Sequence, residues 1–434
     1  MAITEAPRIV TSRLGHEDSH TLERYLATGG YEGLRKALSM TPEAVAAEVD
    51  AVSLLGRGGA GFPAGRKWSM LRKGPVPYLV VNGDESEPAT FKDHMLVERD
   101  PHQLIEGVVI AAYAIQAARA FVYIRGEFAL GLERVQSALN DAYEHGAVGR
   151  DIFGSGFSVD IVVHPGAGAY ICGEETALIE SLEGKRGFPR IKPPYFPAAI
   201  GLYGEPTVVN NVETLSNLPW VMVHGSAAFS ALGAGRSTGT RLFALAGHVR
   251  NPGVYEVEMV KTTFRDLIFA PVLGGGIPGG RQLKAVIPGG VSAPWFGPQH
   301  LDLPLGQDEV AEQGSMLGSG SIVVMDESTC AVRAAWRITR FFRRESCGQC
   351  TPCREGSGWL EKILRRIEDG VGRDDDLDLL MDLCDNLAPG VSWPPQQTTI
   401  CVLGSSIPSS IASGIRMFRD EFLVHVKDGG CPYG

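Results

Sequence analysis

Gly56-Arg-Gly-Gly-Ala-Gly-Phe-Pro-Ala-Gly-Arg-Lys-Trp68 is a stretch with five glycines in ten residues, followed by Arg66 and Lys67. Glycine lets a backbone approach a ligand closely and exposes N–H groups that attract anions. Lysine adds a point charge that suits phosphate. The stretch therefore predicts a ligand-binding loop. The alternative is a flexible surface loop, although Phe62 and Trp68 are unusual in a solvated linker.

The spacing of Gly56, Gly58 and Gly61 matches the dinucleotide fingerprint G-x-G-x-x-G. That fingerprint has to leave a strand and open a helix. Here residues 42–55 predict a helix, and Pro63 follows Gly61 by two positions. The context thus argues against a standard Rossmann site, and we expect a non-standard, Rossmann-like α/β core instead.

Composition narrows the class of protein. The chain has 434 residues, 44% of them hydrophobic, and a formal net charge of −10. This length predicts two to four domains, and the acidic balance argues against nucleic acid as a partner. Residues 1–13 lack the apolar core of a secretory signal, and the apolar run 104–118 is too short to span a membrane. We expect a cytoplasmic protein.

Strands and helices alternate in the first half. Short apolar strands are predicted at 78–82, 121–125 and 159–163, which indicates an α/β core with a mostly parallel sheet. A second glycine loop, His164-Pro-Gly-Ala-Gly-Ala-Tyr-Ile-Cys-Gly-Glu-Glu-Thr176, follows the third strand. Ligands bind at the carboxyl ends of such strands, so the loops after Asn82 and His164 are predicted to converge on one crevice. Residues 208–214 are predicted to open a helix.

The pattern changes after residue 240. A hairpin at 242–257, a helix from about residue 263 and a strand at 284–288 predict a β-grasp-like α+β unit. Helices are predicted at 331–344, 358–369, 377–387 and 407–426, which indicates a small helical bundle. The predicted domains are 1–238, 239–328 and 329–434.

Cys347-Gly-Gln-Cys-Thr-Pro-Cys353 carries the sharpest chemical signal. The spacing C-x-x-C-x-x-C can direct three thiolates into one pocket, as a cubane iron–sulfur cluster requires. A ferredoxin-type run would place its fourth cysteine where Ser357 stands, so a remote cysteine has to complete the site. Structural zinc is the alternative, but it more often uses two separated pairs.

The fourth ligand can be chosen from four remote cysteines. Cys384 lies on an apolar stripe at helical spacing, which is typical of a core position. Cys330 precedes a helix, and Cys431 lies in a glycine-rich tail. Cys401 lies in a short apolar connection between two bundle helices, and we predict it as the ligand. Cys172, inside the second glycine loop, is either near the ligand or a small buried hydrophobe.

Taken together, these motifs resemble the NADH-binding FMN/iron–sulfur flavoprotein subunit of respiratory complex I (NADH:quinone oxidoreductase). The resemblance covers nearly the whole chain. Its motifs are Gly56-Arg-Gly-Gly-Ala-Gly-Phe-Pro, Asn82-Gly-Asp-Glu-Ser-Glu-Pro, Gly168-Ala-Tyr-Ile-Cys-Gly-Glu-Glu-Thr, Val209-Asn-Asn-Val-Glu-Thr, Cys347-Gly-Gln-Cys-Thr-Pro-Cys-Arg and Ile400-Cys-Val-Leu-Gly. Diaphorase subunits of NAD-reducing hydrogenases and NAD-dependent formate dehydrogenases share this core and are the alternative. A non-catalytic iron–sulfur scaffold that binds a nucleotide is a further one.

The resemblance implies FMN, a [4Fe–4S] cluster and NADH as substrate. It implies direct hydride transfer from NADH to FMN, with no catalytic side chain. The implied FMN contacts are Gly56, Gly58, Lys67, Asn82, Asp84, Tyr170, Gly173, Glu174, Val209, Asn210, Asn211 and Thr214. The implied NADH contacts are Phe62, Glu87, Glu175, Lys192 and Phe196, and the implied cluster ligands are Cys347, Cys350, Cys353 and Cys401.

Some assignments stay open at this point. Tyr195 competes with Phe196 as the aromatic wall, because the segment 192–197 has one residue more than the common family motif. Met70 stands where the family often has an aromatic residue. The acidic residues near Glu85 and Glu174 suit ribose hydroxyls, or else form a solvated rim. The implied partners are a thioredoxin-like [2Fe–2S] subunit and a large iron–sulfur subunit, at the cytoplasmic face of the membrane.

Overall fold

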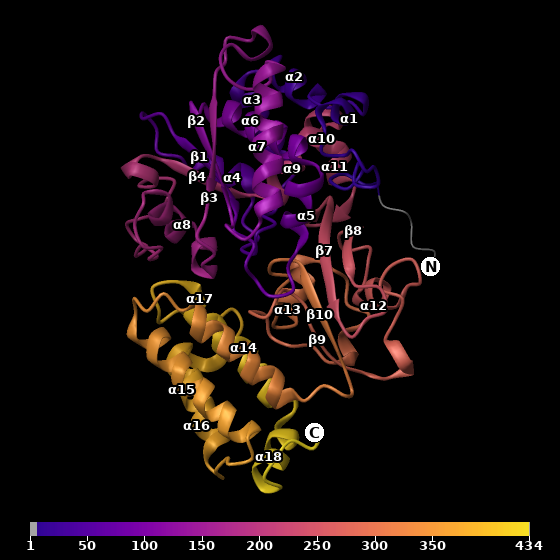
Figure 1. The fold of residues 1–434 in the computed structure, drawn as a ribbon, viewed down its shortest axis with the longest axis vertical. Helices are drawn as coiled ribbons and strands as arrows, with labels where there is room; N and C mark the ends of the chain where they lie inside the picture. Colours follow the sequence, from indigo (N-terminus) through magenta and orange to yellow (C-terminus); the bar gives the residue numbers. More distant parts are fainter. Residues whose placement is uncertain (1–6, 434) are drawn as a thin grey trace.

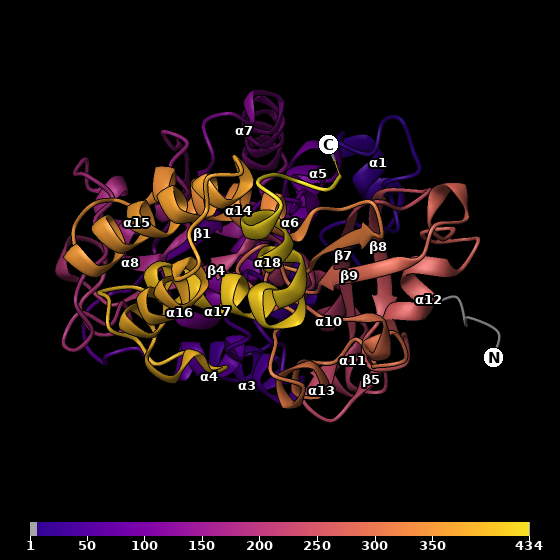
Figure 2. The ribbon, with the colours of Figure 1, turned by 90° about the horizontal axis from the view of Figure 1, so that it is seen from below.

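The computed structural model of the chain describes residues 7–433, so residues 1–6 and 434 of the predicted first and third domains lie outside the described residues. Figure 1 shows three parts: a sheet covered by helices at the top, a second sheet at lower right, and a helical bundle at lower left. Figure 2 shows the bundle from below, with α17 and α18 drawn across the region of the first sheet.

Helices lead into the first glycine loop, as predicted. Threonine side chains cap two of them, since Thr21 accepts a bond from the N–H of Arg24 and Thr41 from that of Ala44. The four helices of this segment are α1 (Leu22–Ala27), α2 (Glu32–Leu38), α3 (Pro42–Ala51) and α4 (Ala64–Ser69).

The first sheet is entirely parallel, which confirms the predicted α/β core. Its strands are β1 (Tyr78–Gly83), β2 (Arg119–Ile124), β3 (Asp160–Pro165) and β4 (Thr207–Asn211), in the order β3-β2-β1-β4. The sequence pattern assigns 208–214 to a helix start, whereas the structure places β4 first. The strand ends where the Asn211 side chain accepts a bond from the N–H of Glu213 and caps α9. Because this capping residue indicates a helix start, the sequence pattern did not predict the five-residue strand that precedes it.

Helices pack around this sheet. The central one is α6, whose residues 101–112 are all buried. Asp100 caps this helix, and Pro101 lies in its first turn. The helices of this part are α5 (Lys92–Arg99), α6 (Pro101–Ile115), α7 (Ala129–Glu144), α8 (Glu175–Leu182), α9 (Val212–Ser216), α10 (Leu218–His224) and α11 (Ser226–Ser230).

The second sheet is mixed. The predicted hairpin is confirmed as β7 (Thr240–Gly247) and β8 (Gly253–Glu258), and β10 (Ser321–Asp326) lies parallel to β7. β9 (Leu283–Ile287) completes the order β8-β7-β10-β9. α12 (Phe264–Phe269) begins with a capping box between Thr263 and Asp266. Smaller elements are β5 (Gly233–Ala234), β6 (Ser237–Thr238) and α13 (Gln307–Glu312).

The C-terminal part is helical, as predicted, but its boundaries differ. Its helices are α14 (Ala331–Glu345), α15 (Thr351–Glu368), α16 (Asp376–Leu387), α17 (Val402–Met417) and α18 (Arg419–Lys427). α15 begins at Thr351 rather than 358, so the cysteine run enters a helix. The predicted helix 407–426 is two helices, because Phe418 leaves helical geometry between them. Among residues 7–433, no helix is long and apolar enough to cross a membrane.

Short 3-10 turns complete the described elements. They are Ile152–Gly154, Tyr170–Gly173, Leu202–Gly204, Pro278–Gly280, Pro298–His300 and Pro389–Val391.

Candidate functional site

The first glycine loop folds back on itself between α3 and α4. The Gly56 N–H donates to the Phe62 carbonyl at 3.0 Å, which closes the loop. A Cβ at Gly58 would lie 3.1 Å from Cβ of Asn211, so glycine lets the loop approach the end of β4. The loop leaves a helix rather than a strand of the sheet, which agrees with the non-standard construction expected from the sequence.

Arg57 anchors this loop from inside the protein, and no local pattern in the sequence indicates that role. Its guanidinium is buried and donates to the carbonyls of Thr238 and Thr240, at 3.1 and 2.9 Å. Its backbone N–H donates to Oγ1 of Thr214 at 2.9 Å. Burial lowers the pKa of Arg57, and the Glu213 carboxylate opposes that shift. The loop is thus tied both to α9 and to the start of β7.

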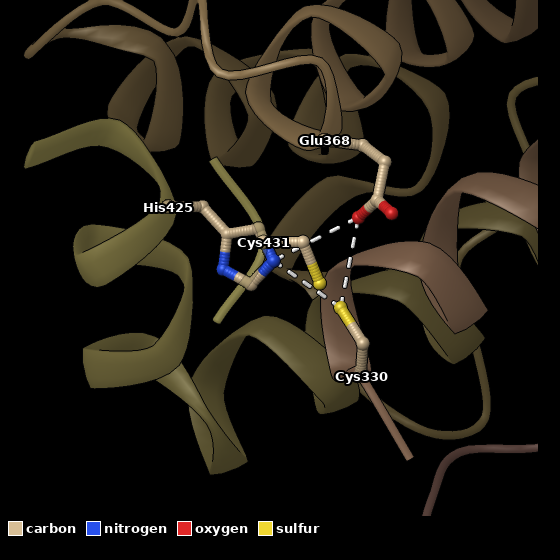
Figure 3. Close-up of side chains that lie close together, drawn as sticks. All are labelled: Cys330, Glu368, His425 and Cys431. Atoms are coloured by element: carbon tan, nitrogen blue, oxygen red, sulfur yellow. Dashed lines mark hydrogen bonds and ion pairs between the residues drawn. The ribbon is translucent and has the colours of Figure 1, made fainter. Parts of the chain in front are cut away.

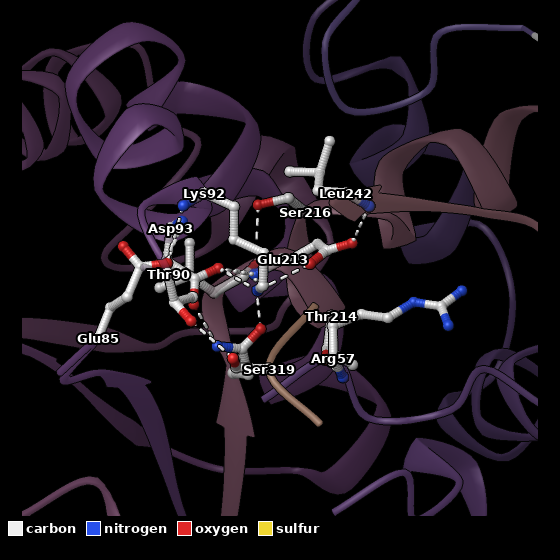
Figure 4. A network of polar contacts seen from close by, with 12 residues as sticks. Arg57, Glu85, Thr90, Lys92, Asp93, Glu213, Thr214, Ser216, Leu242 and Ser319 are labelled. Atoms are coloured by element: carbon white, nitrogen blue, oxygen red, sulfur yellow. Dashed lines mark hydrogen bonds and ion pairs between the residues drawn. The ribbon is translucent and has the colours of Figure 1, made fainter. Parts of the chain in front are cut away.

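A buried polar network holds the acidic segment after β1 (Figure 4). Glu85 Oε1 accepts bonds from the N–H groups of Lys92 and Asp93, both at 2.9 Å, and so caps α5. Lys92 Nζ lies 2.7 Å from Oε2 of Glu213, whose other oxygen accepts a bond from the N–H of Leu242. Glu85 therefore serves helix capping and does not belong to a solvated rim.

The two predicted loops meet at the carboxyl ends of the strands. Asn82 Nδ2 donates to the Gly173 carbonyl at 2.8 Å. Asp84 is buried, and its Oδ1 has no hydrogen-bond partner in the described part of the chain. Burial raises the pKa of Asp84 to about 7, although Ser86 and Arg125 pull it down. An unpartnered buried acceptor fits a ligand that offers hydroxyl groups, as the ribityl chain of FMN does.

Glu87 and Tyr170 lie together against Ser292, in the loop that follows β9. The Tyr170 hydroxyl donates to Oε2 of Glu87 at 2.6 Å, and the N–H of Ser292 donates to Oε1 of Glu87 at 2.9 Å. The Tyr170 ring contacts the bundle through Phe341, with ring centroids 5.1 Å apart. Its N–H donates to Glu345 of α14 at 3.0 Å. The second glycine loop therefore touches all three parts of the fold.

Two lysines and two glutamates form an alternating charge cluster. Lys67 Nζ lies 2.7 Å from Glu175 Oε2 and donates to the Val209 carbonyl at 2.9 Å. Lys192 Nζ lies 2.8 Å from Glu175 and 3.0 Å from Glu174. Burial opposes ionisation of Glu175, but the two lysines lower its pKa to about 2. The carboxylate is therefore charged at neutral pH, next to the first glycine loop.

The remaining predicted flavin contacts line the end of β4. Asn210 Oδ1 accepts a bond from Trp68 Nε1 at 2.9 Å, and Asn211 Nδ2 donates to Asp93 at 2.6 Å. The predicted aromatic contacts are open to solvent: Phe62 is 42% exposed, and Tyr195 and Phe196 are 43% and 50% exposed. These similar exposures do not favour either Tyr195 or Phe196. Met70 is also exposed.

The structure brings the four predicted cluster cysteines into one pocket. Cys347, Cys350, Cys353 and Cys401 line it. Cys350 and Cys401 are the N-cap residues of α15 and α17, so each stands at the start of a bundle helix. Burial raises the pKa of Cys353 to about 11 and that of Cys401 to about 12. Four thiols that line one pocket fit a cationic iron–sulfur core, which would stabilise their ionised form.

Other residues near this pocket explain its position. Ile171 of the second glycine loop and Pro189 form part of its wall. Ser357 is fully buried on α15, and Cys384 is fully buried in the bundle core, outside the pocket. Cys172 is buried. A Cβ at Gly187 would lie only 2.6 Å from the Sγ of Cys172, so Cys172 occupies a tightly packed position that suits a small side chain.

Comparison with known proteins connects both halves to one family. Residues 49–220 match the model of the Nuo51 FMN-binding domain, and residues 333–425 match that of the NADH-ubiquinone oxidoreductase-F iron-sulfur binding region. An F-type subunit of NADH-quinone oxidoreductase in Rhizobium meliloti (strain 1021) is 50% identical over 96% of this chain and 97% of its own length.

Two hydrogenases are also similar. NADP-reducing hydrogenase subunit HndC of Solidesulfovibrio fructosivorans is 45% identical, over 98% of this chain and 84% of its own length. The crystal structure of an NAD+-reducing [NiFe]-hydrogenase in the H2-reduced state matches with a TM-score of 0.81 at 33% identity. That match covers 95% of this chain and 66% of the hydrogenase chain.

Proposed function

Because the chain belongs to the family of F-type subunits of NADH-quinone oxidoreductase, we propose that it is the subunit through which electrons of NADH enter that enzyme. The residues at the strand ends would hold FMN, which would supply a hydride acceptor for NADH and a donor of single electrons to the iron–sulfur cluster. The observation that carries the proposal is the contact between the two halves: Ile171 of the second glycine loop forms part of the wall of the four-cysteine pocket. Flavin and cluster would therefore be neighbours.

The residues at the strand ends would hold FMN. Gly58 leaves the space that a side chain would fill against Asn211, and Asp84 Oδ1 offers an unused acceptor. Lys67 supplies positive charge beside the first glycine loop, which suits a phosphate or another electron-rich group. The proposed FMN residues are the twelve expected from the sequence: Gly56, Gly58, Lys67, Asn82, Asp84, Tyr170, Gly173, Glu174, Val209, Asn210, Asn211 and Thr214.

The rim of the same site would bind NADH. The exposed ring of Phe62 can stack on a nucleotide ring, and the ionised Glu175 can accept bonds from ribose hydroxyls. Lys192 keeps Glu174 and Glu175 oriented. Glu87 and Phe196 complete the proposed contacts. No side chain needs to move a proton, so the residues act by orientation and charge.

The C-terminal cysteines would hold a [4Fe–4S] cluster through Cys347, Cys350, Cys353 and Cys401. We assign the flavin site to a domain of residues 1–238, a β-grasp-like domain to 239–328 and the cluster to 329–434. As partners we propose a thioredoxin-like [2Fe–2S] subunit and a large iron–sulfur subunit, in a complex bound to the cytoplasmic face of the membrane.

A diaphorase subunit of a hydrogenase is the second candidate, favoured by the 45% identity to HndC. The test is anaerobic purification of the chain with its natural partners, followed by addition of NADH. Bleaching of the flavin absorbance together with co-purified quinone-reductase subunits would support the proposal. Co-purified hydrogenase subunits would favour the alternative. A cluster-loaded chain without flavin, or with flavin that NADH does not bleach, would overturn both.

A further inference from the structure

Four side chains of types that can bind a metal converge in one place (Figure 3). Glu368 is at the opposite end of α15 from the cysteine run, so this cluster lies away from the four-cysteine pocket. Cys330 precedes α14, Glu368 is the last residue of α15, His425 lies on α18, and Cys431 belongs to the C-terminal tail. Their ligand atoms all lie within 4.8 Å of one another. None of these residues has a role in the function proposed above.

The separations suit a single small ion. Cys330 Sγ lies 3.2 Å from His425 Nε2 and 3.6 Å from Glu368 Oε2, and the latter two atoms are 3.7 Å apart. Tetrahedral zinc, with bonds of about 2.0–2.3 Å, holds its ligand atoms roughly 3.3–3.8 Å apart. These three ligand atoms are thus at the spacing that zinc requires, and Sγ of Cys431 lies within 4.8 Å of each of them.

The surroundings of the ligands orient them toward one point. His425 Nδ1 lies 2.8 Å from the carbonyl of Glu421, which fixes the ring and leaves Nε2 facing the cysteines. Arg333 binds the other carboxylate oxygen of Glu368. Cys330 and His425 are buried. Outer partners of this kind are typical of metal sites, because they hold the ligands in place.

We propose that Cys330, Glu368, His425 and Cys431 bind one Zn²⁺ ion that fastens the C-terminal tail to the bundle. Two thiolates and an imidazole favour zinc over magnesium or calcium, and four protein ligands leave no open position for a substrate. The site is therefore structural. Cys330 comes from the start of the bundle, Glu368 from the end of α15, and His425 and Cys431 from its C-terminal end, so the ion would link the first and last parts of the bundle.

Residues next to the site extend this link to the second sheet. Lys284 of β9 contacts Glu421 of α18 at 2.5 Å and the hydroxyl of Tyr433 in the tail at 3.1 Å. Glu421 also accepts a bond from the N–H of Ala331 at 2.7 Å. An ion at Cys431 would hold the tail where these contacts form. A disulfide between Cys330 and Cys431 is the competing use of the two sulfurs.

The test is metal analysis of the cluster-loaded chain, purified anaerobically without chelators. We expect about one zinc beside about four irons per chain. Cys431→Ser and His425→Gln should each lose at least about nine-tenths of the zinc and keep the iron and the cluster's EPR signal. Cys384→Ala, which removes a thiol elsewhere in the bundle, should keep both metals. Cys330→Ser is a third variant of the same kind. If it fails to fold, Cys431→Ser and His425→Gln still test whether these side chains bind the zinc.

Any one of the following results would overturn the proposal. One is wild-type protein without zinc that also binds none when Zn²⁺ alone is added. Another is an intact Cys330–Cys431 disulfide in mass spectra of that anaerobically purified chain. The last is zinc retained in folded Cys431→Ser and His425→Gln, or zinc that rises only as iron falls, which would place it in the four-cysteine pocket.

Discussion

Lys67 Nζ lies 2.7 Å from Oε2 of Glu175, although the two residues are 108 positions apart in the chain. This ion pair joins the first glycine loop to the start of α8. Lys192 binds the other oxygen of Glu175 at 2.8 Å and also binds Glu174, so the Glu175 carboxylate bridges the two ammonium groups. A ligand that enters here meets a charge arrangement already fixed by the protein, which lowers the cost of ordering it.

Glu175→Gln should weaken NADH binding and leave FMN in place. A hydrogen bond to a charged group contributes roughly 1.5–3 kcal/mol, so the Michaelis constant for NADH should rise about ten- to a hundredfold. FMN content should not change, because Lys67 keeps its bond to the Val209 carbonyl. Steady-state kinetics and flavin absorbance measure the two quantities.

The matched control for this variant is Glu183→Gln. Glu183 is also paired with cations, Lys185 and Arg190, but at the opposite end of α8. Its substitution should leave the Michaelis constant for NADH unchanged. Loss of flavin from Glu175→Gln, with unaltered affinity for NADH, would place Glu175 in the FMN site instead.

Asp84 should make the FMN-free chain less stable as the pH rises. Its folded-state pKa of about 7 lies above the usual 3.8, because burial penalises the charged carboxylate. A raised pKa gives a contribution that is fully present below about pH 4 and is lost as the pH rises through 7. Three pKa units correspond to about 4 kcal/mol, an upper bound for this contribution.

Asp84→Asn removes this titration and keeps the shape of the side chain. Without FMN, the variant should melt at a higher temperature than the wild type at pH 8, and the difference should shrink toward pH 4. Asp160→Asn, at an exposed carboxyl on β3, should shift the melting temperature little. A difference for Asp84→Asn that is the same at both pH values would show that burial does not raise this pKa.

Local pattern was enough to predict part of this structure. Ligand spacing predicted three cysteines, and the place of Cys401 in a short apolar connection between two helices predicted the fourth. The structure places these four cysteines along one pocket. The contacts of the buried charged side chains could not be predicted. Arg57, for example, donates to carbonyls 181 and 183 positions away in the chain, and a local sequence pattern carries no information about such distant contacts. The cluster of Cys330 and His425 likewise depends on helix packing, since the two residues are 95 positions apart. Strand β4 was not predicted, because the capping residue Asn211 at its end indicates a helix start.

The assignment of the fourth cluster ligand can be tested by substituting two cysteines, each in a separate variant. Cys401→Ser should remove the EPR signal of the reduced cluster, because Cys401 lines the pocket with the other three thiols. Cys384→Ala should keep the signal, since its thiol is buried in the bundle core. A folded Cys384→Ala chain without a cluster would show that the pocket has been assigned the wrong ligand.

Gly58→Val should remove the flavin and keep the cluster. A Cβ at Gly58 would already lie 3.1 Å from Asn211, and the two further methyl groups of valine would occupy the proposed approach to FMN. FMN content should fall at least about tenfold. Gly15→Val is the control, because no atom lies within 4 Å of a Cβ there. Normal FMN content in Gly58→Val would remove this loop from the flavin site.

Cys350→Ser tests whether the flavin and cluster halves work separately. All proposed flavin contacts lie before residue 215, and all proposed cluster ligands lie after residue 346. The second glycine loop contacts the bundle through Tyr170, which binds Glu345 and packs against Phe341, both on α14. These contacts need no cysteine, so the loop should stay in place when the cluster is lost and α14 remains folded.

In the folded Cys350→Ser chain we therefore expect flavin reduction to be retained and electron transfer beyond the flavin to be lost. FMN should stay bound, and NADH should still bleach it at the wild-type rate in anaerobic stopped flow. Electron delivery to the next iron–sulfur protein should collapse, because the carrier between them is missing. Glu345→Gln, with the cluster intact, checks the loop contact itself and should affect bleaching more than cluster content. If a folded, FMN-loaded Cys350→Ser chain cannot be bleached by NADH, the two halves depend on each other and the separation is wrong.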